Sequence, residues 1–300
     1  MRLLSARTAR GETLGVVADG RWLPAQDLLP DGPGVIADLL ASGGAVLDAL
    51  RVAAEASAPR IVRDGQPTDE TEYLAPVPRP GKVVAIGRNY QAHADEEGVD
   101  PPPAPLIFSK WPSSVVGHGT AIRWSAELTA QVDFEAELAV VIGSAARRVT
   151  VDEALDHVLG YTCLNDVSAR DLQFGDGQWA RGKSLDTFCP MGPVLVTADE
   201  IGDPQRLAIS CTVGSERLQD ASTAQMYFSV AEIISYCSAA FTLEPGDVIA
   251  TGTPGGVGAF REPPRFLAEG DRVSVEIERI GRLENVCVVE PAVEPAPVLP

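Results

Sequence analysis

The stretch Asp-Phe-Glu-Ala-Glu at 133–137 places three alternating carboxylates directly before the apolar run Leu-Ala-Val-Val-Ile at 138–142. Side chains two residues apart on a strand point to the same face. Glu135 and Glu137, with Asp133 in the same alternation, are therefore expected to point together at the entrance of a buried strand. Such anions repel one another unless a cation lies between them, and oxygen ligands suit Mg²⁺, Mn²⁺ or Ca²⁺. The alternative is a solvated, acidic strand end.

The composition is that of a soluble globular protein, with 45% hydrophobic residues and a mean hydropathy of +0.05. No apolar run approaches the ~20 residues that span a bilayer, and the first residues lack the apolar core of a signal peptide. The formal net charge of −18 argues against nucleic acid and anionic membranes as partners. Five cysteines without a C-x-x-C pair fit reduced thiols, so we expect a cytoplasmic protein.

Composition divides the chain into three parts. Residues 1–75 form a small leading module. Residues 76–290 form the main body, which begins with a proline-rich connector at 76–80. Residues 291–300 form a proline-rich tail that we expect to be disordered. In the leading module the pattern predicts a strand at 14–17 and helices at 35–40 and 45–56.

The body is rich in strand patterns. Strands are predicted at 82–86, 105–109, 137–142, 192–197, 207–213, 247–251, 272–279 and 284–289, the last two joined as a hairpin through Gly281-Arg282. Two helices carry capping boxes, Thr150 with Glu153 and Ser229 with Glu232. Strands outnumber helices, so the sequence predicts a strand-rich α+β fold.

Residues 177–184, Gly-Gln-Trp-Ala-Arg-Gly-Lys-Ser, match the phosphate-loop pattern G-x-x-x-x-G-K-[ST]. That loop needs an apolar strand before it and a helix after it. Here the preceding residues at 171–176, Asp-Leu-Gln-Phe-Gly-Asp, are not an apolar strand, and Pro190 follows too soon for a long helix. We therefore reject a nucleotide site and keep Lys183 as either a positioned cation or an ordinary surface lysine.

Two further groups of residues carry possible chemistry. Asp166 follows the apolar segment 160–164, where it would supply a third carboxylate ligand or, alternatively, an N-cap for the helix after it. His93 and Glu96 share a face if residues 91–97 are helical. A histidine oriented by a carboxylate is a general-base arrangement, whereas the alternative is a solvated histidine on an acidic helix.

The glycine-rich turn at 251–258, Thr-Gly-Thr-Pro-Gly-Gly-Val-Gly, follows a predicted strand. Its backbone N–H groups and hydroxyls are suited to a carboxylate, and the alternative is a plain tight loop.

Taken in order, these pieces resemble the fumarylacetoacetate hydrolase family over residues 80–290. The matching segments are 86–90 (Ile-Gly-Arg-Asn-Tyr) with His93 and Glu96, 108–110 (Phe-Ser-Lys), 133–137, 164–171 (Leu-Asn-Asp-Val-Ser-Ala-Arg-Asp) with Gln173, 182–188 (Gly-Lys-Ser-Leu-Asp-Thr-Phe) with 191–193 (Met-Gly-Pro), and 251–258. Each segment is weak alone, but six in order are specific. One departure is Trp111, inserted where the family runs Lys-Pro, and it is expected to reshape the pocket wall.

The resemblance implies a fold and a metal. The fold would be a mixed β-sheet roll or barrel behind a small variable N-terminal α+β domain, assembled as a homodimer. Glu135, Glu137 and Asp166 would hold Mg²⁺ or Mn²⁺.

It also implies roles for other side chains. His93 with Glu96 would activate water or move a proton on a segment that closes as a lid. Lys183 would act in catalysis and, with Gln173, hold substrate oxygens. Thr253 would contact the substrate carboxylate, and the matching segments add Arg88, Tyr90 and Gly252 to the substrate-binding set.

Three functions follow from these residues. The leading expectation is a divalent-metal-dependent hydrolase that cleaves a carbon–carbon bond of an acylpyruvate or β-diketo acid through a metal-stabilised enolate. The alternative is a decarboxylase of oxaloacetate-type 2-oxo acids, or a hydroxymuconate-type isomerase or tautomerase, on the same site. The third is a non-catalytic small-molecule binding protein, against which the carboxylates, His93 and Lys183 argue.

Overall fold

Two neighbouring strands form the centre of the fold, β11 (Ala136–Ile142) and β12 (Val158–Asn165). In this computed structural model, which describes residues 1–291, the two strands pair antiparallel, with Ala136 opposite Asn165. The first residues of β11 and the last residues of β12 therefore lie side by side at the same end of the two strands. This brings the carboxylates before β11 close to Asp166.

The apolar run of β11 is continuous because both faces of the strand are buried. Leu138, Val140 and Ile142 belong to one hydrophobic core, shared with the smaller sheet. Ala139 and Val141 belong to a second core, shared with the N-terminal module.

The larger sheet is mixed and has the central strand order β4-β3-β2-β1-β14-β12-β11-β17-β6-β7. Its other strands are β1 (Arg2–Thr8), β2 (Gly11–Ala18), β3 (Arg21–Pro24), β4 (Gln66–Pro67), β5 (Tyr73–Leu74), β6 (Val83–Gly87), β7 (Leu106–Lys110), β8 (Val115–Val116), β14 (Cys189–Thr197) and β17 (Val248–Ala250). β17 runs parallel to β6 and antiparallel to β11, and this puts the turn after β17 beside the first residues of β11.

The smaller sheet has the order β16-β15-β18-β19-β9. Its strands are β9 (Ile122–Ser125), β15 (Ala208–Val213), β16 (Glu216–Ser222), β18 (Arg272–Ile277) and β19 (Gly281–Glu290), and β10 (Val132–Asp133) pairs separately with β13 (Ser168–Ala169). Among the described residues neither sheet closes on itself. The predicted α+β fold is therefore confirmed as a roll, and the barrel form of that prediction is not realised.

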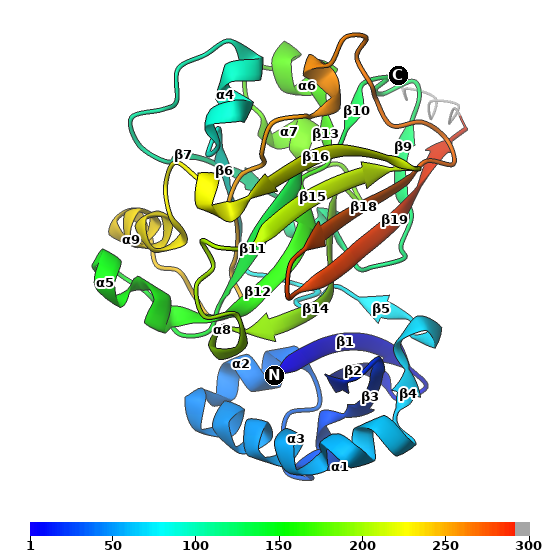
Figure 1. The fold of residues 1–300 in the computed structure, drawn as a ribbon, viewed down its shortest axis with the longest axis vertical. Helices are drawn as coiled ribbons and strands as arrows, with labels where there is room; N and C mark the ends of the chain where they lie inside the picture. Colours follow the sequence, from blue (N-terminus) through cyan, green and yellow to red (C-terminus); the bar gives the residue numbers. More distant parts are fainter. Residues whose placement is uncertain (292–300) are drawn as a thin grey trace, which may run out of the picture.

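The N-terminal module packs α1 (Ala25–Leu28), α2 (Ile36–Ser42) and α3 (Gly44–Asp64) against its own strands, at the lower end of Figure 1. It is joined to the body because β1 pairs antiparallel with β14, Arg2 opposite Val196. The predicted helix at 45–56 continues to Asp64 through Pro59, since Leu50, Ala54 and Ile61 bury one face along its whole length.

The remaining helices lie around the body. They are α4 (Gln91–Glu97), α5 (Val151–Ala154), α6 (Arg170–Gly175), α7 (Ala180–Lys183), α8 (Ala198–Ile201) and α9 (Val230–Ala240), with 3₁₀ turns η1 (Thr68–Glu70), η2 (Pro112–Ser114), η3 (Leu155–His157), η4 (Thr223–Gln225) and η5 (Gly258–Phe260). In Figure 1, α4, α6 and α7 gather at the end of the molecule remote from the N-terminal module. No helix among the described residues is long and apolar enough to cross a membrane.

The body strands that the pattern predicted are all present, with ends shifted by a few residues. The hairpin is present too, but its turn lies at 278–280, before Gly281, because Ile277 pairs with Gly281. Short or polar strands such as β16 were not predicted, because an edge strand with one wet face carries little apolar signal. Of the tail predicted to be disordered, residues 292–300 lie outside the described residues.

The start of α9 supplies a test of the capping prediction. Ser229 accepts from the N–H of Glu232, and the Glu232 carboxylate accepts from the N–H of Ser229 at 2.8 Å. Replacing Ser229 by Ala should therefore lower the free energy of unfolding by about 1 kcal/mol, the usual effect of losing an N-cap. Denaturant titration would measure this change. Ser215→Ala, in the exposed β15–β16 turn, should leave it unaltered, and an equal loss in both variants would contradict the capping interpretation.

Candidate active site

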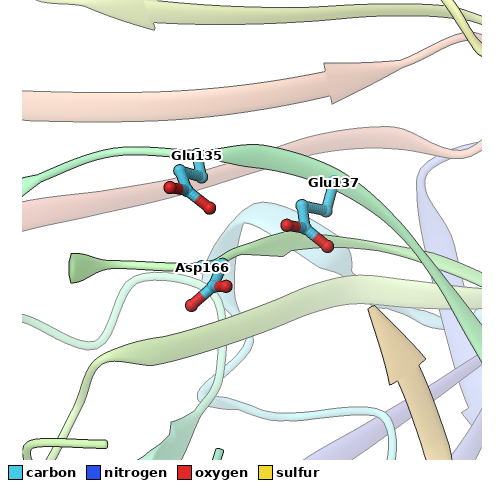
Figure 2. Close-up of side chains that lie close together, drawn as sticks. All are labelled: Glu135, Glu137 and Asp166. Carbon is cyan, nitrogen blue, oxygen red and sulfur yellow. The ribbon is translucent and has the colours of Figure 1, made fainter. Parts of the chain in front are cut away.

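Three buried carboxylates meet where β11 begins and β12 ends. Glu135, Glu137 and Asp166 each offer an oxygen that lies within 4.8 Å of the others. Figure 2 shows the three side chains close together. The Asp166 N–H donates to the Glu135 carbonyl at 2.9 Å, which fixes the two backbones side by side. The carboxylates are at most 4% exposed, so the solvated strand end considered as an alternative is wrong.

Asp166 is not an N-cap, although that interpretation was open from the sequence. Helix α6 begins four residues later, with Ala169 in the cap position. The Asp166 carboxylate instead accepts from Lys110 Nζ at 2.6 Å and from Lys183 Nζ at 3.0 Å. Lys110 and Lys183 are themselves buried, and this rules out the surface-lysine alternative for Lys183.

Cations also surround Glu135. Lys183 Nζ lies 2.7 Å from Glu135 Oε2, and Arg170 Nη1 lies 2.8 Å from Glu135 Oε1. Burial alone would raise the pKa of Glu135, but Lys183 and Arg170 outweigh it and lower this pKa to about 2. Glu135 is therefore a buried carboxylate that stays ionised.

Glu137 has no such compensation. Among the described residues it makes no ion pair, and it accepts one backbone hydrogen bond, from the Gly252 N–H at 2.8 Å. Burial, and then the charges of Asp166 and Glu135, raise the pKa of Glu137 well above its ordinary value. A divalent cation between the three carboxylates would remove that repulsion, so the residues present fit the metal that the sequence predicted.

Asp133 does not join the cluster, contrary to the simple alternation of carboxylates. The chain leaves strand geometry between β10 and β11, and Asp133 accepts from Arg170 Nε at 2.8 Å and from the Gly258 N–H at 2.8 Å. Asp133 thereby holds Arg170 against Glu135 and ties the glycine-rich turn to the site.

His93 lies on α4, and residues 91–97 are helical as expected. Its Nδ1 lies 2.7 Å from Glu96 Oε1 and its Nε2 lies 3.1 Å from Glu97 Oε1. The His93 side chain is only 5% exposed, so the solvated-histidine alternative is wrong. Burial alone would lower the pKa of the imidazole, but Glu96, Glu97 and Glu135 outweigh it and raise this pKa to about 9.

A small pocket joins Glu135 and Glu137 of the triad to α4. Its lining comprises Ile86, Gly87, Arg88, His93, Glu97, Phe108, Glu135, Glu137, Arg170, Gln173, Trp179, Lys183 and Thr253. The structure therefore brings together most of the residues that the sequence singled out.

Of the other predicted site residues, Gln173 and Thr253 line this cavity and Tyr90 does not. Gln173 accepts from Arg170 Nη1 at 3.0 Å, and Thr253 accepts from Gln219 Nε2 at 2.8 Å, which leaves the Thr253 hydroxyl hydrogen free to donate. The Tyr90 hydroxyl is buried without a hydrogen-bond partner in the described part of the chain. Burial, and then Glu137, raise the pKa of Tyr90.

Gly252 was expected to contact substrate. In the structure its N–H orients Glu137, and its backbone has a φ of 98°, where an added Cβ would come within 2.7 Å of Asn89. Substrate contact by Gly252 stays a prediction.

The aromatic wall of the cavity differs from the expectation. Trp111 is 53% exposed and absent from the lining residues, so it does not reshape the pocket wall. Trp179 does line the cavity, with its ring 5.3 Å from that of Phe108 in an edge-on contact and closely packed against Gly87. Its only sequence signal is an aromatic residue inside the 177–184 motif.

The phosphate-loop pattern is explained by packing. The segment follows helix α6 and contains the short helix α7, so a helix and not a strand comes directly before it. A Cβ at Gly182 would lie 2.7 Å from the Gln173 backbone nitrogen, so this glycine permits α7 to pack on α6. The motif orients Lys183 and does not form a nucleotide site.

Sequence reasoning gave no role to Lys110, Arg170 or Glu97, although each is a charged residue in a matching or helical segment. Lys110 pairs with a carboxylate 56 residues away, and Arg170 pairs with carboxylates 35 and 37 residues away. The partners of Glu97 are 4 and 9 residues away. The pairing of Lys110 and Arg170 follows from the way distant strands meet, which the local pattern does not contain, whereas Glu97 meets His93 one helical turn away and was within reach of the helical pattern.

A mixed-sheet roll with a buried carboxylate triad, flanking lysines and a histidine–carboxylate pair defines a small-molecule enzyme. Residues 82–288 match the family described as fumarylacetoacetate (FAA) hydrolase, C-terminal. The chain belongs to the fumarylacetoacetate hydrolase family, as its resemblance predicted.

Similar proteins agree on the family. The chain is 45% identical over 261 residues to the mitochondrial oxaloacetate tautomerase FAHD2B of Bos taurus, covering 86% of this chain and 81% of that one. It is 48% identical over 219 residues to the oxaloacetate tautomerase YisK of Bacillus subtilis, covering 72% and 73%. The solved fumarylacetoacetate hydrolase of Exiguobacterium antarcticum superposes with a TM-score of 0.83 at 37% identity, covering 97% and 100%. Because some relatives are mitochondrial, the cytoplasmic location stays a prediction.

Glu137→Gln tests the triad as a cation site. We expect affinity for Mn²⁺ or Mg²⁺ to fall by more than about tenfold, the effect of losing even an outer partner of a metal ligand. In EDTA the melting temperature should not fall, because the neutral amide relieves the repulsion among buried carboxylates. Calorimetric titration and thermal melts would measure both quantities. The exposed Glu127→Gln is the control, and unchanged metal affinity in Glu137→Gln would contradict the site.

Proposed function

We propose that the protein interconverts the keto and enol forms of oxaloacetate, or of a similarly small 2-oxo dicarboxylate, with Mg²⁺ or Mn²⁺ held by Glu135, Glu137 and Asp166. The observation that carries the proposal is the buried His93, flanked by carboxylates, in one small cavity with the triad. The names of the relatives at 45% and 48% identity support oxaloacetate as substrate. This choice favours the alternative that the sequence left open over the leading expectation of a hydrolase.

The reaction needs a proton removed from C3 and a proton delivered to the oxygen on C2, or the reverse. His93 is the proton carrier, and Glu96 fixes its orientation through Nδ1 at 2.7 Å. A bound divalent cation would supply Lewis-acid stabilisation of the negative charge that develops on the enolate oxygens. Water takes no part, and this suits a cavity enclosed among buried side chains.

Fixed donors hold the substrate. Lys183 and the Gln173 amide provide hydrogen-bond donors beside the triad, and the Thr253 hydroxyl donates to a carboxylate. Arg88 provides a second positive charge at the other end of the cavity, next to α4, which suits a substrate with two carboxylates. The Tyr90 hydroxyl has no hydrogen-bond partner among residues 1–291, and it is a further candidate donor.

Hydrolysis of an acylpyruvate is the second candidate. The likeness to the Exiguobacterium antarcticum hydrolase supports it, and a histidine oriented by a carboxylate is equally suited to activating water. Decarboxylation draws less support, because it needs enolate stabilisation but no base such as His93. The homodimer expected from the family stays a prediction.

A substrate panel with Mn²⁺ or Mg²⁺ tests the proposed function. Enol oxaloacetate should ketonise rapidly in an ultraviolet assay, the rate should collapse in EDTA, and acylpyruvates should be cleaved much more slowly. His93→Asn should lower kcat by about 10²- to 10⁴-fold, the usual contribution of general acid–base catalysis. His157→Asn is the matched control, because His157 contacts Ser144 away from the cavity.

The opposite pattern would overturn the proposal. Fast cleavage of acylpyruvates with no acceleration of oxaloacetate ketonisation assigns the hydrolase. Carbon dioxide release that outpaces ketonisation assigns the decarboxylase.

The Trp179 wall predicts substrate size. Trp179→Ala removes the ring that packs on Phe108 and Gly87, and it should widen the cavity. We expect kcat/KM to fall for oxaloacetate and to rise for longer 2-oxo acids such as six-carbon acylpyruvates or hydroxymuconates. The exposed Trp111→Ala should leave the ratio of the two unchanged. Parallel steady-state assays would measure the ratio of kcat/KM for oxaloacetate to kcat/KM for the longer acids. If this ratio is unaltered in Trp179→Ala, Trp179 does not limit substrate size.

A further inference from the structure

Each ring nitrogen of His93 faces a carboxylate. Nδ1 faces Glu96 and Nε2 faces Glu97, at 2.7 and 3.1 Å. A neutral imidazole carries one N–H, so both contacts with ionised carboxylates are hydrogen bonds only when both nitrogens are protonated. The two contacts suit an imidazolium between two carboxylates, and an imidazolium is not a base until Nε2 gives up its proton.

The two carboxylates are not equivalent. Glu96 Oε2 accepts from the Gly256 N–H at 2.7 Å, so this carboxylate is tied to the glycine-rich turn. Glu97 lines the cavity beside His93, whereas Glu96 is not among the lining residues that the structure describes. Glu97 is therefore the carboxylate that both faces the substrate space and contacts the reactive nitrogen.

Arg88 holds the other oxygen of Glu97. Its Nε lies 2.8 Å from Glu97 Oε2, and its guanidinium carbon lies 5.6 Å from the centre of the Trp179 ring. Arg88 has a φ of 57°, an uncommon left-handed backbone for a residue other than glycine, in a segment that lines the cavity. The contact keeps Glu97 ionised in the resting site, since burial would raise its pKa but His93 and Arg88 outweigh it.

We propose that Glu97 is a second proton carrier of the reaction, paired with His93 Nε2, and that Glu96 serves only to orient the ring. This inference rests on the proposed tautomerase function. The proton on Nε2 passes to Glu97 Oε1, and Nε2 then takes the proton from C3 as the C3–H bond breaks. The C3–H electron pair forms the enolate, whose C2 oxygen takes the proton from Glu97. One proton leaves C3, one reaches the oxygen, and both side chains return to their resting state.

The charged surroundings of His93 bear on the test. Glu96 and Glu97 face it from its own helix, Glu135 acts from the segment before β11, and Arg88 acts through Glu97 from the segment after β6. Phe260 on η5 packs against the ring with centroids 6.3 Å apart. Removing the charge of Glu97 alone therefore leaves Glu96 and Glu135 in place and isolates its contribution.

Glu97→Gln is the test, with Asp95→Asn as the matched control on the exposed side of the same helix. Glu97→Gln should lower kcat by about 10²- to 10⁴-fold with little change in KM and should remove one limb of the pH profile. Formate should partly restore the turnover of Glu97→Ala, because it supplies the missing carboxylate. Wild-type kcat and pH profile in Glu97→Gln, or an Ala variant that formate does not rescue, would overturn the proposal.

A measurement without substrate separates this proposal from the proposed function. The titration of His93, followed by nitrogen NMR in labelled protein, should shift down by about one pH unit or more in Glu97→Gln and stay unchanged in Asp95→Asn. An unshifted titration overturns the Glu97–His93 pairing even if oxaloacetate is the substrate. A shifted titration in a protein that does not tautomerise oxaloacetate supports the pairing and overturns only the proposed reaction.

Discussion

The compensation of buried negative charge is the constraint on which the site depends. Ionised carboxylates are stable away from water only when cations and hydrogen-bond donors face them. Lys183, Lys110 and Arg170 compensate Glu135 and Asp166, but nothing positive contacts Glu137 among the described residues. An uncompensated carboxylate lowers the stability of the fold but favours the binding of a cation. The triad is therefore a candidate functional site.

The fold produces this arrangement from two antiparallel strands and one turn. The register of β11 against β12 sets Glu135 beside Asp166, and β17 sets its glycine-rich turn against Glu137. Because the two faces of β11 are packed in separate cores, a one-residue shift of its register would move each side chain into the opposite core and would separate the carboxylates. The same packing therefore maintains stability and the geometry of the site.

The sequence predicts the parts whose signal is local. The apolar run after Glu137, the helix that carries His93 and the strands of the body depend on neighbouring residues, and each was predicted with ends off by a few positions. Register across the sheet is not local, so the roles of Lys110 and Arg170 in pairing with distant carboxylates could not be predicted. For the same reason Trp111 was expected in the pocket wall, where Trp179 lies instead.

Local charge balance explains how an acidic protein accepts an anionic substrate. The whole chain has a formal net charge of −18, which by itself would repel a dicarboxylate. Around the cavity, however, the carboxylates are nearly matched by basic groups, and a bound divalent cation would make the balance positive. The carboxylates are Glu96, Glu97, Asp133, Glu135, Glu137 and Asp166, and the basic groups are Arg88, His93, Lys110, Arg170 and Lys183. A substrate anion entering this enclosed space therefore meets a nearly neutral or positive field, because nearby paired charges in a low-dielectric site outweigh distant, solvent-screened ones. The acidic surface does not prevent an anion from binding in the cavity, because water screens the charges of the surface but not those inside the cavity.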